Sequence, residues 1–96
     1  MLRDYEMVTI INPNVTEEAM ATAVEKLTQL VVSHGGTMSA VTPWGRRRLA
    51  YTIKSFNEGN YVLATFKLDP KMVSGLEADL MISEDLIRHL VVRVGD

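Results

Sequence analysis

The chain has 96 residues, which is enough for one folded domain and too few for two. Hydrophobic residues make up 47% and charged residues 23%, which excludes a disordered or fibrous protein, and the absence of cysteine excludes a disulfide framework. The net charge of −2 argues against a uniformly basic nucleic-acid binder. Without a signal-peptide pattern or a bilayer-length apolar stretch, we expect a single domain over residues 1–96 that is cytoplasmic. The alternative is an organellar protein that has lost a presequence.

The first third of the chain predicts a strand followed by a helix. Residues 5–11 show the alternating pattern of a strand. Asn14 is the expected N-cap of the helix, with Glu17 three residues later as in a capping box. The helix ends just before Gly35 and Gly36, which supply its left-handed C-terminal cap. Its buried stripe consists of Met20, Val24, Leu27 and Val31.

The middle of the chain predicts a hairpin of two strands. The strand that follows the helix contains Pro43 and Gly45, which indicate an edge position or a bulge. The strand pattern resumes over residues 48–54, and residues 55–60, rich in Asn and Gly, are the expected turn. A returning strand covers residues 61–68.

A second helix and a last strand complete the pattern. Asp69 followed by Pro70 is a helix start, because aspartate caps the helix and proline fits its first position. Residues 86–94, rich in Val and Leu, predict a strand. The order strand, helix, strand, strand, helix, strand matches an α+β, ferredoxin-like βαββαβ sandwich. Right-handed crossovers place both helices on one face of its four-stranded antiparallel sheet.

Such a sandwich leaves the other face of the sheet open. Four apolar side chains are expected on that face among polar neighbours, namely Val8, Ile10, Tyr61 and Leu63. This face is more apolar than contact with water favours. We therefore expect these four residues to bind a partner.

Basic residues gather in one segment of this acidic chain. Residues 38–57 include four basic residues and no acidic one. Arginine binds phosphate through a planar fork of donors and stacks on bases. Strand alternation sends Arg46 and Arg48 to one side and Arg47 to the other. From these residues alone, RNA contact and a solvated hairpin edge are equal alternatives, and packing is the favoured role of Trp44.

The segment from Gly45 to Lys54, Gly-Arg-Arg-Arg-Leu-Ala-Tyr-Thr-Ile-Lys, resembles the signature of the bacterial-type ribosomal protein six family of the small subunit. Tyr5-Glu6 and Ile87-Arg88 also resemble that family at matching places, so the resemblance covers essentially the whole chain. It implies a ferredoxin-like protein that binds the central domain of small-subunit ribosomal RNA. It also implies a heterodimer with small-subunit ribosomal protein eighteen and a role in subunit assembly.

The resemblance also implies roles for individual residues. The expected RNA contacts are Arg46, Arg47 and Arg48 in the signature, and Arg3, Arg88 and Arg93 near the first and last strands. For the last three, a solvated charge at a strand end is the alternative. Leu49, Tyr51 and Ile53 are assigned to packing.

Three rival functions lack their characteristic residues. An acylphosphatase-like enzyme would need an arginine in the loop at residues 11–14. An RNA-recognition motif would present aromatic residues on its central strands, whereas this chain has Tyr61 without an aromatic set and has Leu90 and Val92 on the last strand. A regulatory ligand-binding module would show a glycine-lined pocket at the first turn. No catalytic motif occurs, and the two histidines, His34 and His89, are far apart in the sequence. We therefore expect a docking protein, with no catalysis, cofactor, metal, small-molecule substrate or membrane contact.

Overall fold

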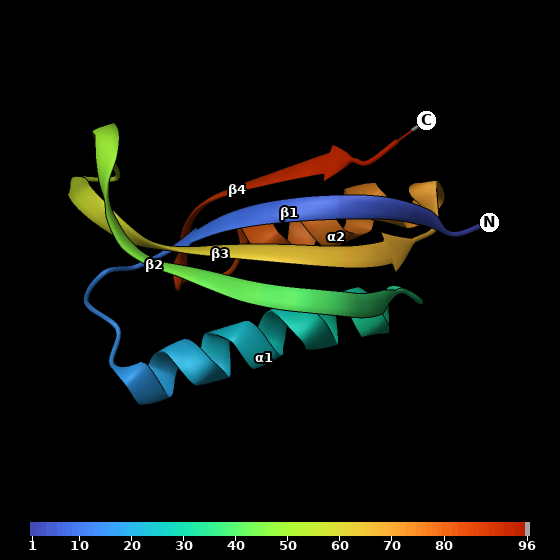
Figure 1. The fold of residues 1–96 in the computed structure, drawn as a ribbon, viewed down its shortest axis with the longest axis horizontal. Helices are drawn as coiled ribbons and strands as arrows, with labels where there is room; N and C mark the ends of the chain where they lie inside the picture. The colour runs from blue at the N-terminus through green and yellow to red at the C-terminus, as the bar shows by residue number, and fades with distance from the viewer. Residues whose placement is uncertain (96) are drawn as a thin grey trace.

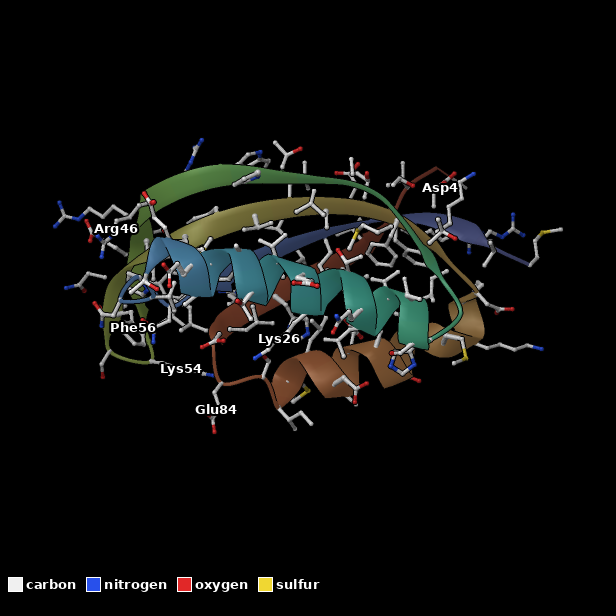
Figure 2. All side chains as sticks on the ribbon, turned by 90° about the horizontal axis from the view of Figure 1, so that it is seen from below. Asp4, Lys26, Arg46, Lys54, Phe56 and Glu84 are labelled. Carbon is white, nitrogen blue, oxygen red and sulfur yellow. The ribbon has the colours of Figure 1, made fainter. Side chains whose placement is uncertain are left out.

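The computed structural model describes residues 1–95, and its elements follow the predicted order. They are β1 (Arg3–Ile11), α1 (Glu17–Ser33), β2 (Thr37–Ile53), β3 (Phe56–Leu68), the short 3-10 helix η1 (Pro70–Met72), α2 (Val73–Met81) and β4 (Leu86–Arg93). The four strands form one antiparallel sheet in the order β2-β3-β1-β4, and both helices lie on the same face of it (Figures 1 and 2). This is the predicted ferredoxin-like sandwich.

The main core lies between the helices and the sheet. Alternation along β1 sends Tyr5, Met7 and Ile11 to the helix face, where all three are buried. The residues that α1 and α2 bury against them are Ala23, Leu27, Val31, Leu76 and Leu80. Each large apolar side chain placed there stabilises the fold by about 1.5–3 kcal/mol relative to exposure.

Helix α1 begins two residues later than predicted. Its N-cap is Thr16, whose hydroxyl accepts the Ala19 backbone N–H at 3.1 Å. The predicted N-cap, Asn14, lies in the preceding turn, because its own N–H donates to Asn12 Oδ1 at 2.8 Å. Glu17 therefore stands in the first turn of the helix, where a negative charge interacts favourably with the helix dipole.

The C-terminal end of α1 confirms the predicted glycine cap. Gly35 has a φ of +84°, and the Gly36 N–H donates to the Val31 carbonyl at 2.9 Å. A Cβ on Gly36 would lie 2.5 Å from the Lys67 carbonyl oxygen, so the chain turns against β3 at a distance that only glycine allows.

The hairpin of β2 and β3 is longer than predicted and its turn is shorter. The turn consists of Lys54 and Ser55, and β3 already begins at Phe56. Both turn residues have positive φ, 49° and 70°, as the tight type I′ turn of a hairpin requires. The glycine that suggested a longer turn, Gly59, serves packing instead, because a Cβ there would collide with the Ile10 side chain.

β2 is an edge strand with irregular register, as Pro43 and Gly45 predicted. A further shift lies between the pairs of Arg48 and Ile53, where β2 has more residues than β3. Because this shift interrupts the alternation, Tyr51 is 60% exposed, and the prediction that it packs is wrong. The end of the hairpin bends away from the plane of the sheet, as Figure 1 shows at its left side. We call this end, residues 46–60, the arm.

The arm is held by a second, smaller core. Ile10, Leu49 and Ile87 are buried in it, and Phe56 and Tyr61 pack against them. This cluster joins the arm to the strands β1 and β4. The position of every side chain on the arm therefore depends on it.

Candidate functional site

The two layers of the molecule carry opposite charges. The acidic residues of the helices and their adjoining loops are Glu17, Glu18, Glu25, Asp69, Glu77, Asp79, Glu84 and Asp85, against Lys26 and Lys71. The basic residues of the strands and the arm are Arg3, Arg46, Arg47, Arg48, Lys54, Lys67, Arg88 and Arg93, against Asp4, Glu6 and Glu58. The small negative net charge is thus the sum of an acidic helix layer and a basic sheet layer. The sheet layer attracts polyanions at close range.

Arg46 and Arg48 lie on one side of the arm, as strand alternation predicted, and both line the same hollow beside Pro13. Arg46 Nη2 donates to the Pro13 carbonyl at 3.0 Å, and its Nε lies 3.3 Å from Glu58 Oε2. These contacts hold the Arg46 side chain between the arm and the loop before α1. Figure 2 shows Arg46 at the outer end of the molecule.

Arg47 lies on the other side of the arm, over Trp44. Its guanidinium carbon is 5.6 Å from the centre of the Trp44 ring, a cation–π geometry. Packing is the role that the sequence favours for Trp44, but the side chain remains 42% exposed at the bulge of Gly45. The pair therefore presents a charged and an aromatic group together at the surface.

Arg88 reaches the arm from β4. Its guanidinium donates a hydrogen bond to the Tyr51 hydroxyl and lies 5.8 Å from the centre of the Tyr51 ring. Three elements therefore bring positive side chains to one end of the molecule. We call this set the basic arm cluster; it consists of Arg46, Arg47, Arg48, Lys54 and Arg88.

The two remaining predicted arginines lie at the opposite end of the sheet. Arg3 begins β1, and Arg93 ends β4 opposite Tyr5. Ile11, the last residue of β1, is roughly 27 Å from Arg3 at about 3.4 Å per residue. Figure 2 places Asp4 at this end, away from Arg46. The six predicted arginines therefore form two groups.

The open face of the sheet carries most of the apolar residues predicted for it. Val8, Tyr61 and Leu63 are partly exposed there, but Ile10 is only 7% exposed because the arm covers it. Between the arm and β4 lies a hollow of about 260 Å³. Its lining includes Val8, Ile10, Tyr51, Tyr61, Arg88 and Leu90.

The sequence prediction did not include Leu90 and Val92, which extend this surface. They are 58% and 49% exposed, and they pair with Val8 and Glu6, whose side chains point to the open face. The sequence shows them within an apolar run, Leu90 to Val92, in the last strand. The register that places them on the open face is not visible in the sequence.

The histidines and carboxylates of residues 1–95 form no metal-binding cluster. No three His, Cys, Asp or Glu residues come close enough there to hold a metal ion. His34 is instead bonded to Asp79, with 2.8 Å between Nε2 and Oδ2, and this contact links α1 to α2. None of the helices described has the length and apolar character needed to cross a membrane.

Comparison with known proteins identifies the family. Residues 4–93 match the family model of ribosomal protein S6. The chain belongs to the ribosomal protein S6 family. Among its relatives, small ribosomal subunit protein bS6 of Moorella thermoacetica is 43% identical over 99% of this chain and 97% of that protein. The same-named protein of Heliobacterium modesticaldum is 44% identical over 96% of each.

Solved structures confirm the fold of this S6 family member. The crystal structure of 30S ribosomal protein S6 from Thermotoga maritima matches with a TM-score of 0.89 and 34% identity, over 97% of this chain and 88% of that one. The C-terminal domain of the MgtC protein from Mycobacterium tuberculosis shares the fold at a TM-score of 0.64 with 14% identity. The predicted family, the predicted fold and the predicted ribosomal localisation are confirmed, and the last of these rests on the relatives rather than on the fold.

Proposed function

We propose that this S6 family member is a structural protein of the small ribosomal subunit that binds the central domain of small-subunit ribosomal RNA. It does so with small-subunit ribosomal protein eighteen as a heterodimer, and the complex contributes to subunit assembly. Residues 1–96 act as one RNA-binding domain that docks and does not catalyse a reaction. The observation that carries the proposal is the basic arm cluster on a protein whose helix layer is acidic.

The arm is suited to a folded RNA. Arg46 contacts Pro13 and Glu58, and Arg47 and Arg88 lie over aromatic rings, so these three side chains need little ordering when they bind. Phosphate contacts of this kind fix position and orientation, and the shape of the RNA supplies specificity. Arg3 and Arg93 are proposed as contacts to a second RNA segment beyond the far end of the sheet.

The open face supports the partner half of the proposal. Val8, Tyr61 and Leu63 form it together with Leu90 and Val92, and Ile10 lies beneath them as part of the surface that holds the arm. A protein that covers this face removes apolar surface from water and also packs against the arm. Partner and RNA binding should therefore reinforce each other.

RNA binding by the chain, with and without protein eighteen, across a salt series tests the proposal. Replacing Arg46, Arg47 and Arg48 by alanine should weaken binding roughly tenfold or more and lower the salt slope by about 2 to 3. The control, Lys26→Ala with Lys71→Ala, removes two positive charges from the helix layer and should leave affinity unchanged. Equal losses in both variants, or binding that does not depend on protein eighteen, would contradict the proposal.

A further inference from the structure

The two edges of the sheet differ in their protection against pairing with another strand. β2, at one edge, contains Pro43, a bulge at Gly45, further register shifts and the run Arg46–Arg48. Proline, bulges and charge are the features by which proteins keep an edge strand from adding another strand. β2 is therefore a protected edge.

β4, at the other edge, pairs with β1 in a regular register, and most of its residues are uncharged. Its register with β1 is unbroken from Arg93 back to Arg88, and between these two arginines the sequence has no proline, glycine or acidic residue. The same stretch exposes Leu90 and Val92. A straight apolar edge of this kind is a template for a further strand.

The hydrogen bonds to β1 show which backbone groups of β4 point outward. The Val94 N–H donates to the Asp4 carbonyl at 2.9 Å, which continues the β1–β4 register by one pair. Along an antiparallel strand, the backbone N–H and C=O groups of every second residue point to the same neighbouring strand. The backbone groups of Val92 and Leu90 therefore also point to β1. The residues whose N–H and C=O groups point to the edge are His89, Val91 and Arg93.

A second copy of the chain would not cover this surface. Two copies joined through β4 would lie side by side in one sheet, and both open faces would stay uncovered. Their contact would be a strip of roughly 27 by 10 Å, far below the roughly 800 Å² per partner of a stable interface. A different protein can add a strand to β4 and continue over the open face, where it also covers Val8, Leu63 and Leu90.

We propose that the protein partner docks by adding an extended segment to the free edge of β4. The segment pairs with the backbone of His89, Val91 and Arg93, and its side chains on the open face are apolar, to match Leu90 and Val92. This inference rests on the proposed function for the existence of a protein partner, and it adds where and in which conformation that partner binds.

Hydrogen exchange of backbone amides, followed by NMR on the full chain alone and with protein eighteen, tests the inference. In the free chain the amides of Leu90 and Val92 should exchange slowly, and those of His89, Val91 and Arg93 rapidly. Partner binding should slow the latter three by at least roughly tenfold, because they gain hydrogen bonds. If the heterodimer forms and these three amides still exchange rapidly, strand addition is overturned while the proposed function stands.

Two variants of one residue separate folding from docking. His89→Pro removes an outward N–H without breaking the β1–β4 ladder, and His89→Ala removes the same side chain but keeps the N–H. We expect both to fold, and His89→Pro to bind protein eighteen at least roughly tenfold more weakly than His89→Ala. Equal affinities would overturn strand addition. If the edge amides of the chain alone become more protected as its concentration rises, the edge pairs with a second copy, and strand addition by the partner is overturned. If no heterodimer forms at all, both proposals are overturned.

Discussion

Gly59→Ala should destabilise the protein because it overfills the core that holds the arm. The added Cβ would overlap Ile10 Cγ2, and it would also lie 3.5 Å from Ile87 Cδ1. Cγ2 is bonded directly to the Cβ of a β-branched residue, so it cannot move without a strained rotamer or a backbone shift. Ile10 is also only 7% exposed and packs in one buried cluster with Leu49 and Ile87.

Two opposing terms set the magnitude. Overpacking a filled core costs about 1–3 kcal/mol, whereas replacing glycine by alanine in a strand recovers about 0.5–1 kcal/mol. At the midpoints of these two ranges the net loss is about 1.3 kcal/mol. For a domain of this size the melting temperature should fall by roughly 5 to 10 °C. Thermal and urea unfolding, followed by circular dichroism, measure both quantities.

A double-mutant cycle shows whether the Ile10 contact is the cause. Ile10→Ala removes Cγ2, so Gly59→Ala should be neutral or stabilising in that background. The two substitutions should therefore couple by at least about 1 kcal/mol. If Gly59→Ala is as stable as the parent chain, or if its effect is the same in both backgrounds, Ile10 does not exclude a side chain from position 59.

Three further substitutions have defined outcomes. The Lys71 backbone N–H and the N-terminal ammonium, 3.1 Å from Oδ2, lower the pKa of Asp69 below 3.8, so the ionised carboxylate favours the fold. This contribution to the free energy of unfolding is present above pH 3.8 and is lost as the pH falls through the lower, folded-state pKa. Asp69→Asn should therefore reduce the loss of stability below pH 3.8, as measured by urea unfolding at several pH values. Ser55→Gly should raise stability by about 0.5–1 kcal/mol, because glycine adopts a φ of 70° without strain, and urea unfolding should show it. Tyr51→Ala should weaken RNA binding roughly two- to fivefold by removing the ring beneath Arg88, and Tyr51→Phe should restore it in a fluorescence anisotropy titration.

Local sequence signals predicted the elements well and their ends less well. Gly35 and Asp69 mark helix boundaries by backbone conformation and capping, which are properties of a few neighbouring residues, and both predictions are confirmed. Asn14 and Thr16 are both good N-cap residues, so the sequence could not choose between them. The side chain of Asn12 decides the matter by holding Asn14 in the turn.

The candidate site depends on contacts that no local pattern contains. Tyr51 occupies an alternating position in the signature segment, yet the register shift after Arg48 exposes it and brings it to Arg88. Likewise, Leu90 and Val92 join the open face through pairing with β1, a strand about eighty residues earlier in the chain. The sequence predicts that Tyr51 packs, and it assigns no role to Leu90 and Val92. The pairing of strands that are far apart in the sequence places all three side chains at the surface.

The separation of charge between the layers would give the proposed RNA complex of this acidic chain a single orientation. A phosphate backbone that approaches the helix layer meets Glu17, Glu77 and Asp79, and it is repelled there. At the arm it meets five positive side chains, and three of them, Arg46, Arg47 and Arg88, are held by a backbone contact or an aromatic ring. The acidic residues therefore contribute to specificity by disfavouring the wrong face. The open face is apolar and lies between the arm and the far end of the sheet, so it is better suited to the proposed protein partner than to RNA.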